Sequence, residues 1–128
     1  MKEDGMMTIV GHGMSMSLPA MPSSRENTKT TKRLQKEWNL GPEKTSVDPK
    51  DNKPYWNKMA AVWGVSEKEA RRQLCANCEY FKDDPKWMEA MEAIPLNEFD
   101  MDGGGRGYCT KFDFICHNLR TCQAWELE

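Results

Sequence analysis

The stretch Cys75-Ala-Asn-Cys78-Glu-Tyr-Phe81 places two cysteines two residues apart, directly before two aromatic residues. This spacing lets two thiolates from one tight turn converge on one metal ion or on two irons of one cluster. One such pair is a moderate signal, because zinc knuckles and redox dithiols use it too. Three more cysteines follow it along the chain: Cys109, Cys116 and Cys122. The C-terminal part of the chain, from Cys75 onward, is therefore predicted to hold a metal centre on four thiolates.

Aromatic residues accompany the cysteines on both sides of this region. The segments that show it are Cys78-Glu-Tyr80-Phe81, Tyr108-Cys109-Thr-Lys-Phe112 and Cys122-Gln-Ala-Trp125. An aromatic shell excludes water from an iron-sulfur cluster and tunes its potential, whereas a zinc site does not require one. The context favours an iron-sulfur cluster and leaves zinc as the alternative metal.

With these segments the chain resembles the high-potential iron-sulfur proteins from about residue 75 to its end. Their cysteine pair followed by an aromatic residue, their Gly-aromatic-Cys segment and their final Cys-x-Ala-Trp correspond to the segments beginning at Cys75, Gly107 and Cys122. The resemblance implies one [4Fe-4S] cluster in a small, loop-rich fold that carries single electrons. By position, it assigns the four ligand places to Cys75, Cys78, Cys109 and Cys122.

The chain also departs from the family pattern. The stretch between Cys78 and Cys109 is longer, Arg120-Thr121 stands where the family usually has a glycine and an aromatic residue, and Cys116 is extra. Cys116 is interpreted as a buried free thiol or as a ligand in place of Cys122 or Cys109. The two histidines are expected to be ordinary surface residues: His12 and His117.

The composition points to a small core that needs reinforcement. Only 38% of the 128 residues are hydrophobic, ten of them are Met, and the formal net charge is -2. A short chain of this kind needs a staple, such as a metal centre. The odd number of cysteines and the absence of a secretory or twin-arginine signal favour metal or free thiols over disulfides. We therefore expect a cytoplasmic protein or one residing in an assembled particle such as a virion, and no membrane segment is apparent.

Charge is distributed unevenly along the chain. Residues 1–74 carry 13 basic and 9 acidic side chains, whereas residues 75–128 carry 5 basic and 11 acidic ones. An acidic cysteine-bearing unit argues against direct binding of nucleic acid. The mild basic excess before it is interpreted as solvated surface charge.

The N-terminal part, residues 1–54, is predicted to be an extended arm. Gly, Ser, Thr and Pro interrupt it repeatedly, and only residues 31–40 suggest a helix, with Leu34 and Trp38 on one side. Such a segment becomes ordered where a partner supplies apolar surface. The expected partners are the protein subunits of a larger assembly, contacted through residues 1–54.

Residues 55–128 are predicted to form the cluster-binding domain, with short helices and little β structure. A capping box at Ser66 predicts a helix over about 67–74, and Asp84 followed by Pro85 predicts another that ends near residue 93. Its inner face is assigned to Trp87, Met88 and Met91. Residues 100–107 are expected to be a glycine-rich loop, and residues 108–114 the one strand.

Motifs of catalytic chemistry are absent from the sequence, so an enzyme is not expected. Calcium at Asp100 and Asp102 lacks the rest of a ligand series. The preferred function is a structural protein whose cluster staples a module of a larger assembly, with a capsid or tail component of a phage or viral particle as the example. The alternatives are a soluble one-electron carrier that uses a [4Fe-4S] cluster and a zinc-stapled interaction domain.

Overall fold

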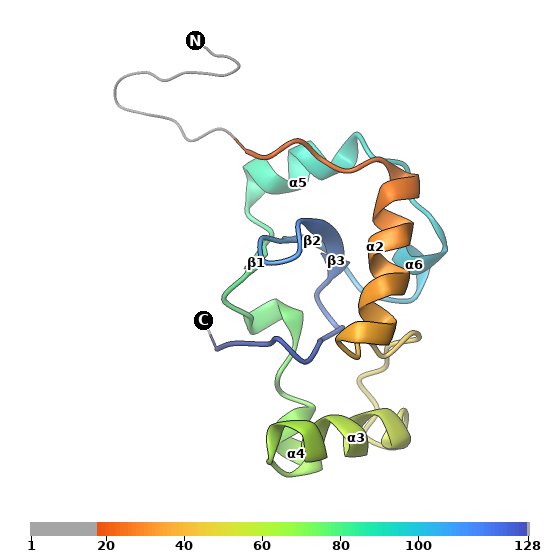
Figure 1. Cartoon of the computed structure of the whole chain (residues 1–128), viewed down its shortest axis with the longest axis vertical. Coiled ribbons are helices and arrows are strands. Elements are labelled where there is room, and N and C mark those ends of the chain that lie inside the picture. The colour runs from red at the N-terminus through yellow and green to blue at the C-terminus, as the bar shows by residue number, and fades with distance from the viewer. Residues whose placement is uncertain (1–17, 128) are drawn as a thin grey trace.

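The computed structural model describes residues 18–127, in which five short helices surround a three-stranded antiparallel sheet (Figure 1). This agrees with the small fold of short helices expected from the sequence. In the view of Figure 1, α3 and α4 lie at one end, α5 lies at the other, and the sheet lies between them. The elements in chain order are α2 (Ser24–Glu37), α3 (Lys53–Trp63), α4 (Glu67–Ala70), the 3-10 turn η1 (Cys75–Asn77), β1 (Phe81–Lys82), α5 (Pro85–Glu92), α6 (Glu98–Met101), β2 (Arg106–Cys109) and β3 (Phe114–His117).

The sheet is ordered β1-β2-β3, and β2 and β3 form a hairpin with Cys109 opposite Phe114. The expectation of one strand over residues 108–114 is therefore wrong. The chain reverses inside that stretch, where the Asp113 N–H donates to the Cys109 carbonyl at 2.8 Å and Asp113 adopts a φ of 54°. Aspartate tolerates this left-handed conformation better than most residues. The aromatic residues at both ends of the turn conceal it in the sequence pattern.

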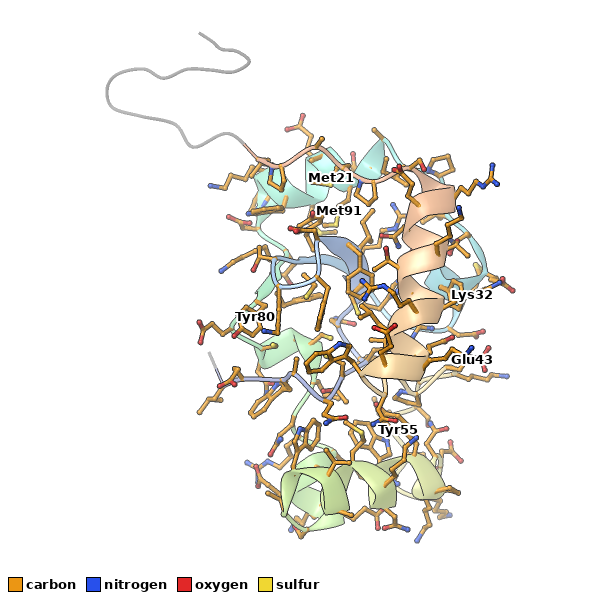
Figure 2. All side chains as sticks on the ribbon, viewed as in Figure 1. Met21, Lys32, Glu43, Tyr55, Tyr80 and Met91 are labelled. Atoms are coloured by element: carbon orange, nitrogen blue, oxygen red, sulfur yellow. The ribbon has the colours of Figure 1, made fainter. Side chains whose placement is uncertain are left out.

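The two faces of the sheet lead into separate apolar clusters, because successive side chains of a strand point to opposite sides. Phe114 and Cys116 of β3 pack with Phe81, Leu34 and Leu40. Between them, Ile115 points the other way, into a cluster with Met91 and Tyr108. Figure 2 shows Met21, which packs against this second cluster, beside Met91. One face of the sheet is thus covered from α2, and the other from α5.

Helix α2 belongs to this folded unit. It begins with a capping box, in which the Ser23 Oγ accepts from the Glu26 N–H at 3.1 Å and the Glu26 carboxylate accepts from the Ser23 N–H at 2.9 Å. The Asn27 amide then pairs with the edge of β3: its Nδ2 donates to the Ile115 carbonyl at 3.0 Å, and its Oδ1 accepts from the Ile115 N–H at 2.6 Å. The Asn27 side chain thus makes the two hydrogen bonds that a neighbouring strand would make to Ile115.

The expectation of an extended arm up to residue 54 is wrong for the part of the arm that the structure describes. Residues 24–37 are helical, and the side chains of Leu34 (0% exposed) and Leu40 (6% exposed) lie in the core beside the cysteines. Few apolar residues are needed, since a buried amide supplies part of the attachment. Residues 1–17 lie outside the described residues.

Helices α3 and α4 form a separate apolar unit around Trp56, Met59, Ala60 and Ala70. The predicted cap is present, because the Ser66 Oγ accepts from the Glu69 N–H at 3.0 Å. The helix does not continue to residue 74 as expected but ends at Ala70. The following amides bond to carbonyls three residues back, which tightens the chain into a turn before η1.

The predicted helix after Asp84 is confirmed as α5. Its inner face is also confirmed, with Met91 1% exposed and the rings of Trp87 and Tyr108 stacked at 5.1 Å between centroids. Asp84 occupies the cap position but makes no side-chain cap bond. The expected loop over residues 100–107 is shorter, since α6 extends to Met101.

Candidate metal centre

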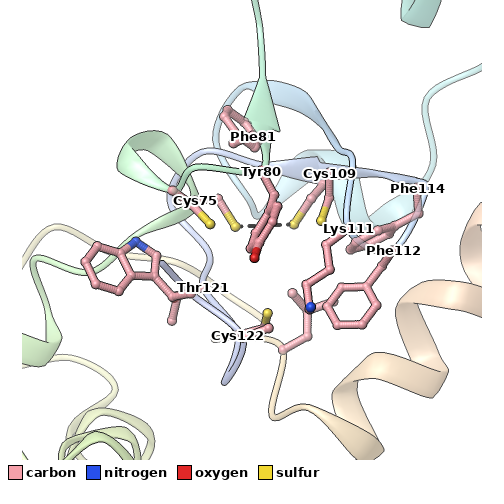
Figure 3. Close-up of a pocket in the computed structure, with 14 residues that line it drawn as sticks. Cys75, Tyr80, Phe81, Cys109, Lys111, Phe112, Phe114, Thr121 and Cys122 are labelled. Atoms are coloured by element: carbon pink, nitrogen blue, oxygen red, sulfur yellow. Dashed lines mark hydrogen bonds between the residues drawn. The ribbon is translucent and has the colours of Figure 1, made fainter. Parts of the chain in front are cut away.

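All five cysteines line one pocket between η1, the β2–β3 hairpin and the C-terminal segment (Figure 3). The four cysteines that the sequence singled out are together, and Cys116 joins them. The thiols are free of disulfides. We call this space the thiol pocket; its cavity volume is about 20 Å³. Its lining residues are Leu40, Cys75, Cys78, Tyr80, Phe81, Cys109, Lys111, Phe112, Phe114, Cys116, Thr121, Cys122, Ala124 and Trp125.

The first two cysteines are placed by the turn η1. The Cys78 N–H donates to the Cys75 carbonyl at 2.9 Å, which closes the turn. The turn is attached to the segment after β3, because the N–H groups of Cys75 and Ala76 donate to the carbonyls of Arg120 and Asn118 at 2.6 and 3.1 Å. Two distant parts of the sequence thus fix where Cys75 stands.

Backbone N–H groups donate hydrogen bonds to the thiols of Cys109 and Cys122. Burial raises the pKa of Cys109 to about 12, although hydrogen bonds from the Phe112 and Lys111 N–H groups act to lower it. Burial likewise raises the pKa of Cys122 to about 12, against a hydrogen bond from the Ala124 N–H. Amides directed at a sulfur stabilise its thiolate, which is the form that binds metal. Metal binding at these thiols must therefore release protons.

Cys75 and Cys116 form a close pair, with 3.7 Å between their Sγ atoms. Cys116 is 2% exposed and lies in the middle of β3. Its hydrogen bond, together with burial, raises the pKa of the Cys75 thiol well above the usual range. In the metal-free protein one S–H···S hydrogen bond therefore joins the two sulfurs, and either of them can be its donor.

The walls of the thiol pocket are apolar and largely aromatic, as the sequence context predicted. Tyr80, Phe81, Phe112 and Trp125 all line it, whereas Tyr108 belongs to the opposite face of the sheet. The Trp125 Nε1 donates to the Leu74 carbonyl and to the Asn77 Oδ1, both at 2.9 Å. These bonds fix the indole against the cysteine turn and leave its apolar surface for the pocket.

One charged side chain reaches the rim of the pocket. The Lys111 Nζ lies 5.2 Å from the centroid of the Tyr80 ring and 5.8 Å from that of Phe112 (Figure 3). An ammonium group over aromatic faces is attracted by their π electrons. Lys111 therefore contributes positive charge beside sulfurs that a metal would keep negative.

Thr121 provides a further test of whether a metal group fits. Its side chain is 0% exposed and lines the thiol pocket, yet its Oγ1 has no hydrogen-bond partner among the described residues. A buried hydroxyl without a partner costs free energy, so it calls for an explanation. An anionic sulfur in the pocket would accept a hydrogen bond from this hydroxyl. Soft thiolate donors around an apolar space also suit iron-sulfur clusters and zinc.

Behind the pocket lies a buried polar network that the sequence did not reveal. The Arg120 Nη1 donates to the His117 Nδ1 at 2.7 Å, so His117 is assigned as neutral and its Nε2–H donates to the Asp100 Oδ1 at 2.8 Å. Asp100 also accepts from the Arg106 Nε at 2.8 Å. The network joins α6, β2, β3 and the segment that carries Cys122.

The expectation that His117 lies at the surface is wrong, since it is 3% exposed. Alternation along β3 turns it away from the pocket and towards α6. Burial would raise the pKa of Asp100, but the hydrogen bonds from Arg106, His117 and the Asn97 N–H lower it to about 2. Asp100 is thus committed to internal contacts and is not free for a calcium ion. His12 lies outside the described residues.

Arg120 is the functional neighbour that sequence reasoning missed most clearly. It is 3% exposed, and besides His117 its guanidinium donates to the carbonyls of Pro42, Glu43 and Phe99. A lone arginine before Thr121 carries no pattern that distinguishes burial from exposure. The one available signal was that Arg120-Thr121 stands where high-potential iron-sulfur proteins usually have a glycine and an aromatic residue.

Between residues 18 and 127, no three Cys, His, Asp or Glu side chains are gathered at the spacing of a single bound ion. Within the same range, no helix is long and apolar enough to cross a membrane.

No family model matches the chain, and neither the curated proteins nor the solved structures contain a match. The resemblance to high-potential iron-sulfur proteins therefore rests on the cysteine and aromatic segments themselves. It stays a hypothesis about the thiol pocket.

Proposed function

We propose that this protein is a small structural protein in which a [4Fe-4S] cluster, held by Cys75, Cys78, Cys109 and Cys122, staples the fold. The observation that carries the proposal is the convergence of cysteines from three separate parts of the chain on one aromatic-walled pocket. A cluster in this position links η1, the hairpin and the C-terminal segment. Apart from it, those parts are joined by backbone hydrogen bonds, small apolar clusters and the polar network.

The size of the core supports a stapling role. The cluster of buried residues on the pocket face contains only five members, and one of them is Cys116. In small domains a bound metal supplies folding free energy, because the unfolded chain offers no preformed site. When bound, the cluster contributes four metal–thiolate bonds, while the chain contributes the amides, the aromatic walls and the exclusion of water.

The stapling role is tested by removing the metal. Protein purified without oxygen should lose the fixed environment of Trp125 and Phe112 after treatment with an iron chelator and an oxidant, seen as loss of near-ultraviolet circular dichroism. Restoring iron and sulfide should recover the signal. An unchanged spectrum and unchanged thermal unfolding after complete metal removal would contradict a structural cluster.

The assembly part of the proposal has a different basis. Residues 38–52 form a long irregular connection, and Val47 within it is 86% exposed. Leu96, Met101 and Leu127 are also exposed, at 70%, 77% and 69%. Single exposed apolar side chains also occur on monomeric proteins, so this part of the proposal depends on the irregular connection, which suits contacts with neighbouring protein subunits, as in a virion. Fractionation of purified viral particles should recover the protein together with the particle subunits. Recovery of the protein only as a free monomer would contradict the assembly role.

A soluble one-electron carrier is the second candidate, favoured by the position of the thiols. Cys78, Cys109 and Cys122 are only half-buried, beside a rim made of Tyr80 and Lys111. A cluster near the surface exchanges electrons readily. Reversible one-electron voltammetry of the native protein would favour this role, and decay of the cluster on oxidation would oppose it.

Zinc stays the alternative metal, and one distance favours it. Two thiolates on one tetrahedral zinc, each about 2.3 Å from the metal, lie about 3.8 Å apart. The Cys75 and Cys116 sulfurs are 3.7 Å apart. Under this alternative Cys116 is a ligand together with Cys75, and the protein is colourless and redox-silent. Metal analysis separates the two cases.

A further inference from the structure

Cys116 is a fifth thiol in a pocket where four ligands suffice, and its place is well defined. It lies in β3 opposite Gly107, on the same face of the strand as Phe114, and is 2% exposed. Its sulfur therefore faces the thiol pocket from the most regular part of the fold. The sequence suggested that it could replace Cys122 or Cys109, but the structure places it beside Cys75.

The distance between the two sulfurs decides what they can do together. In a [4Fe-4S] cube each iron takes one protein thiolate, so the four ligand sulfurs belong to four different corners. Sulfurs 3.7 Å apart reach the same corner. Cys75 and Cys116 are thus alternatives for one iron.

Their backbones are also tied together, which keeps the two sulfurs close. The N–H groups of Cys75 and Ala76 bond to carbonyls in the segment that directly follows β3. Gly107 opposite Cys116 has no room for a side chain, because a Cβ there would collide with the Phe81 ring. The backbones of Cys75 and Cys116 therefore stay neighbours as long as the turn and the hairpin persist.

We propose that Cys116 is a reserve ligand of the cluster, able to take the iron position of Cys75. This inference rests on the proposed function. While Cys75 is the ligand, Cys116 keeps its proton and donates a hydrogen bond to the Cys75 sulfur. In the exchange, the Cys75 sulfur releases the iron and receives the proton of Cys116, and the Cys116 thiolate binds the iron. Charge and protons balance, and no oxidant is required.

The test compares iron and sulfide content, and the visible spectrum, in full-length variants purified without oxygen. Cys75→Ala should keep most of the wild-type cluster, because Cys116 takes its place and gives its proton to water. Cys116→Ala should also keep it, whereas the double variant should lose it. Cys78→Ala is the matched control with no reserve and should lose the cluster. A Cys75→Ala protein as empty as the double variant would overturn the inference.

A second measurement uses only variants with all four proposed ligands. If Cys116 recaptures iron that Cys75 releases, Cys116→Ala should lose its cluster to a chelator several-fold faster than the wild-type protein does. Equal rates would overturn the inference even if Cys75→Ala failed to fold. The cluster content of the wild-type protein distinguishes the two proposals. If the wild-type protein contains the cluster but the variants contradict the exchange, only the reserve role of Cys116 fails. If the wild-type protein contains no cluster, the proposed function and the reserve role both fail.

Discussion

The two faces of the three-stranded sheet are stabilised in different ways. One face is covered by side chains that are 1% exposed, namely Tyr108, Ile115 and Met91. On the same face, the Asp100 carboxylate accepts hydrogen bonds from Arg106 and His117. On the other face, the strands border the thiol pocket. There Cys75 and Cys116 form the one close sulfur pair among the described residues, the other three thiols have no sulfur partner, and Thr121 has an unused hydroxyl. The first face is stabilised by contacts within the chain, while the second leaves thiols and a hydroxyl without partners, which the proposed cluster would supply.

Strand β3 links two different kinds of stabilisation. Its alternating side chains send Cys116 to the pocket and His117 to the polar network. Changes on the pocket face should therefore alter metal content, and changes on the opposite face should alter stability at constant metal content.

The largest effect is expected for Cys109→Ser. Loss of this ligand should remove nearly all bound metal and unfold the C-terminal unit, because metal binding supplies on the order of 10 kcal/mol in small thiolate sites. Iron content and thermal unfolding measure both consequences. Cys116→Ser is the control and should retain its metal. Wild-type metal content and stability in Cys109→Ser would show that Cys109 is not a ligand.

Next in size is Asp100→Asn, on the opposite face. It removes the counter-charge of partly buried Arg106, whose Nε lies 2.8 Å from Asp100, and should cost about 3 kcal/mol of unfolding free energy at neutral pH. Denaturant unfolding measures the loss, and the iron content should not change. Glu98→Gln, exposed on the same helix, should have little effect.

The same variant carries a pH signature. The pKa of Asp100 is about 2 in the folded protein against an ordinary value of 3.8. A depressed carboxyl pKa stabilises the fold fully above the unfolded value, and this contribution is lost as the pH falls towards the folded value. The stability gap between wild type and Asp100→Asn should therefore narrow between about pH 4 and pH 2. A gap that is constant across this range would contradict the assignment.

A smaller effect is expected for Asn27→Ala. The change leaves the N–H and carbonyl of buried Ile115 without their partners at 2.6 and 3.0 Å, which should cost about 2 kcal/mol. Asn57→Ala, at an exposed position of α3, is the control. If Asn27→Ala proved as harmless as the control, α2 would not be anchored to the sheet edge through this amide.

The smallest change in stability is expected for Thr121→Val, which keeps the shape of the side chain. If the Thr121 hydroxyl donates to a cluster sulfur, its removal should make the reduction potential more negative, because hydrogen bonds to sulfur stabilise the reduced cluster. Thr121→Ser should keep the native potential. A more stable Thr121→Val protein with an unchanged potential would show that the hydroxyl contacts no cluster.

Local signals in the sequence predicted the elements that depend on neighbouring residues. Ser66, Asp84 and Pro85 act within one helical turn, so the starts of α4 and α5 were predictable. The gathering of the cysteines and of their aromatic companions was also predictable, because their spacing is typical of metal sites.

The features that sequence reasoning missed depend on contacts between distant residues. Asn27 meets Ile115 across 88 positions, and Arg120 meets Pro42 across 78. An asparagine in a polar helix and an arginine before a threonine look like surface residues until the fold brings their partners together. The position of Cys116 beside Cys75 is of the same kind, since it depends on the hydrogen bonds that attach η1 to the segment after β3.

The most direct test of the central claim is the iron, sulfide and zinc content of the full-length protein purified without oxygen, measured together with its visible spectrum. We expect a brown protein with about four irons and four sulfides per chain. A colourless protein with one zinc per chain, or a stable and folded protein without metal, would contradict it.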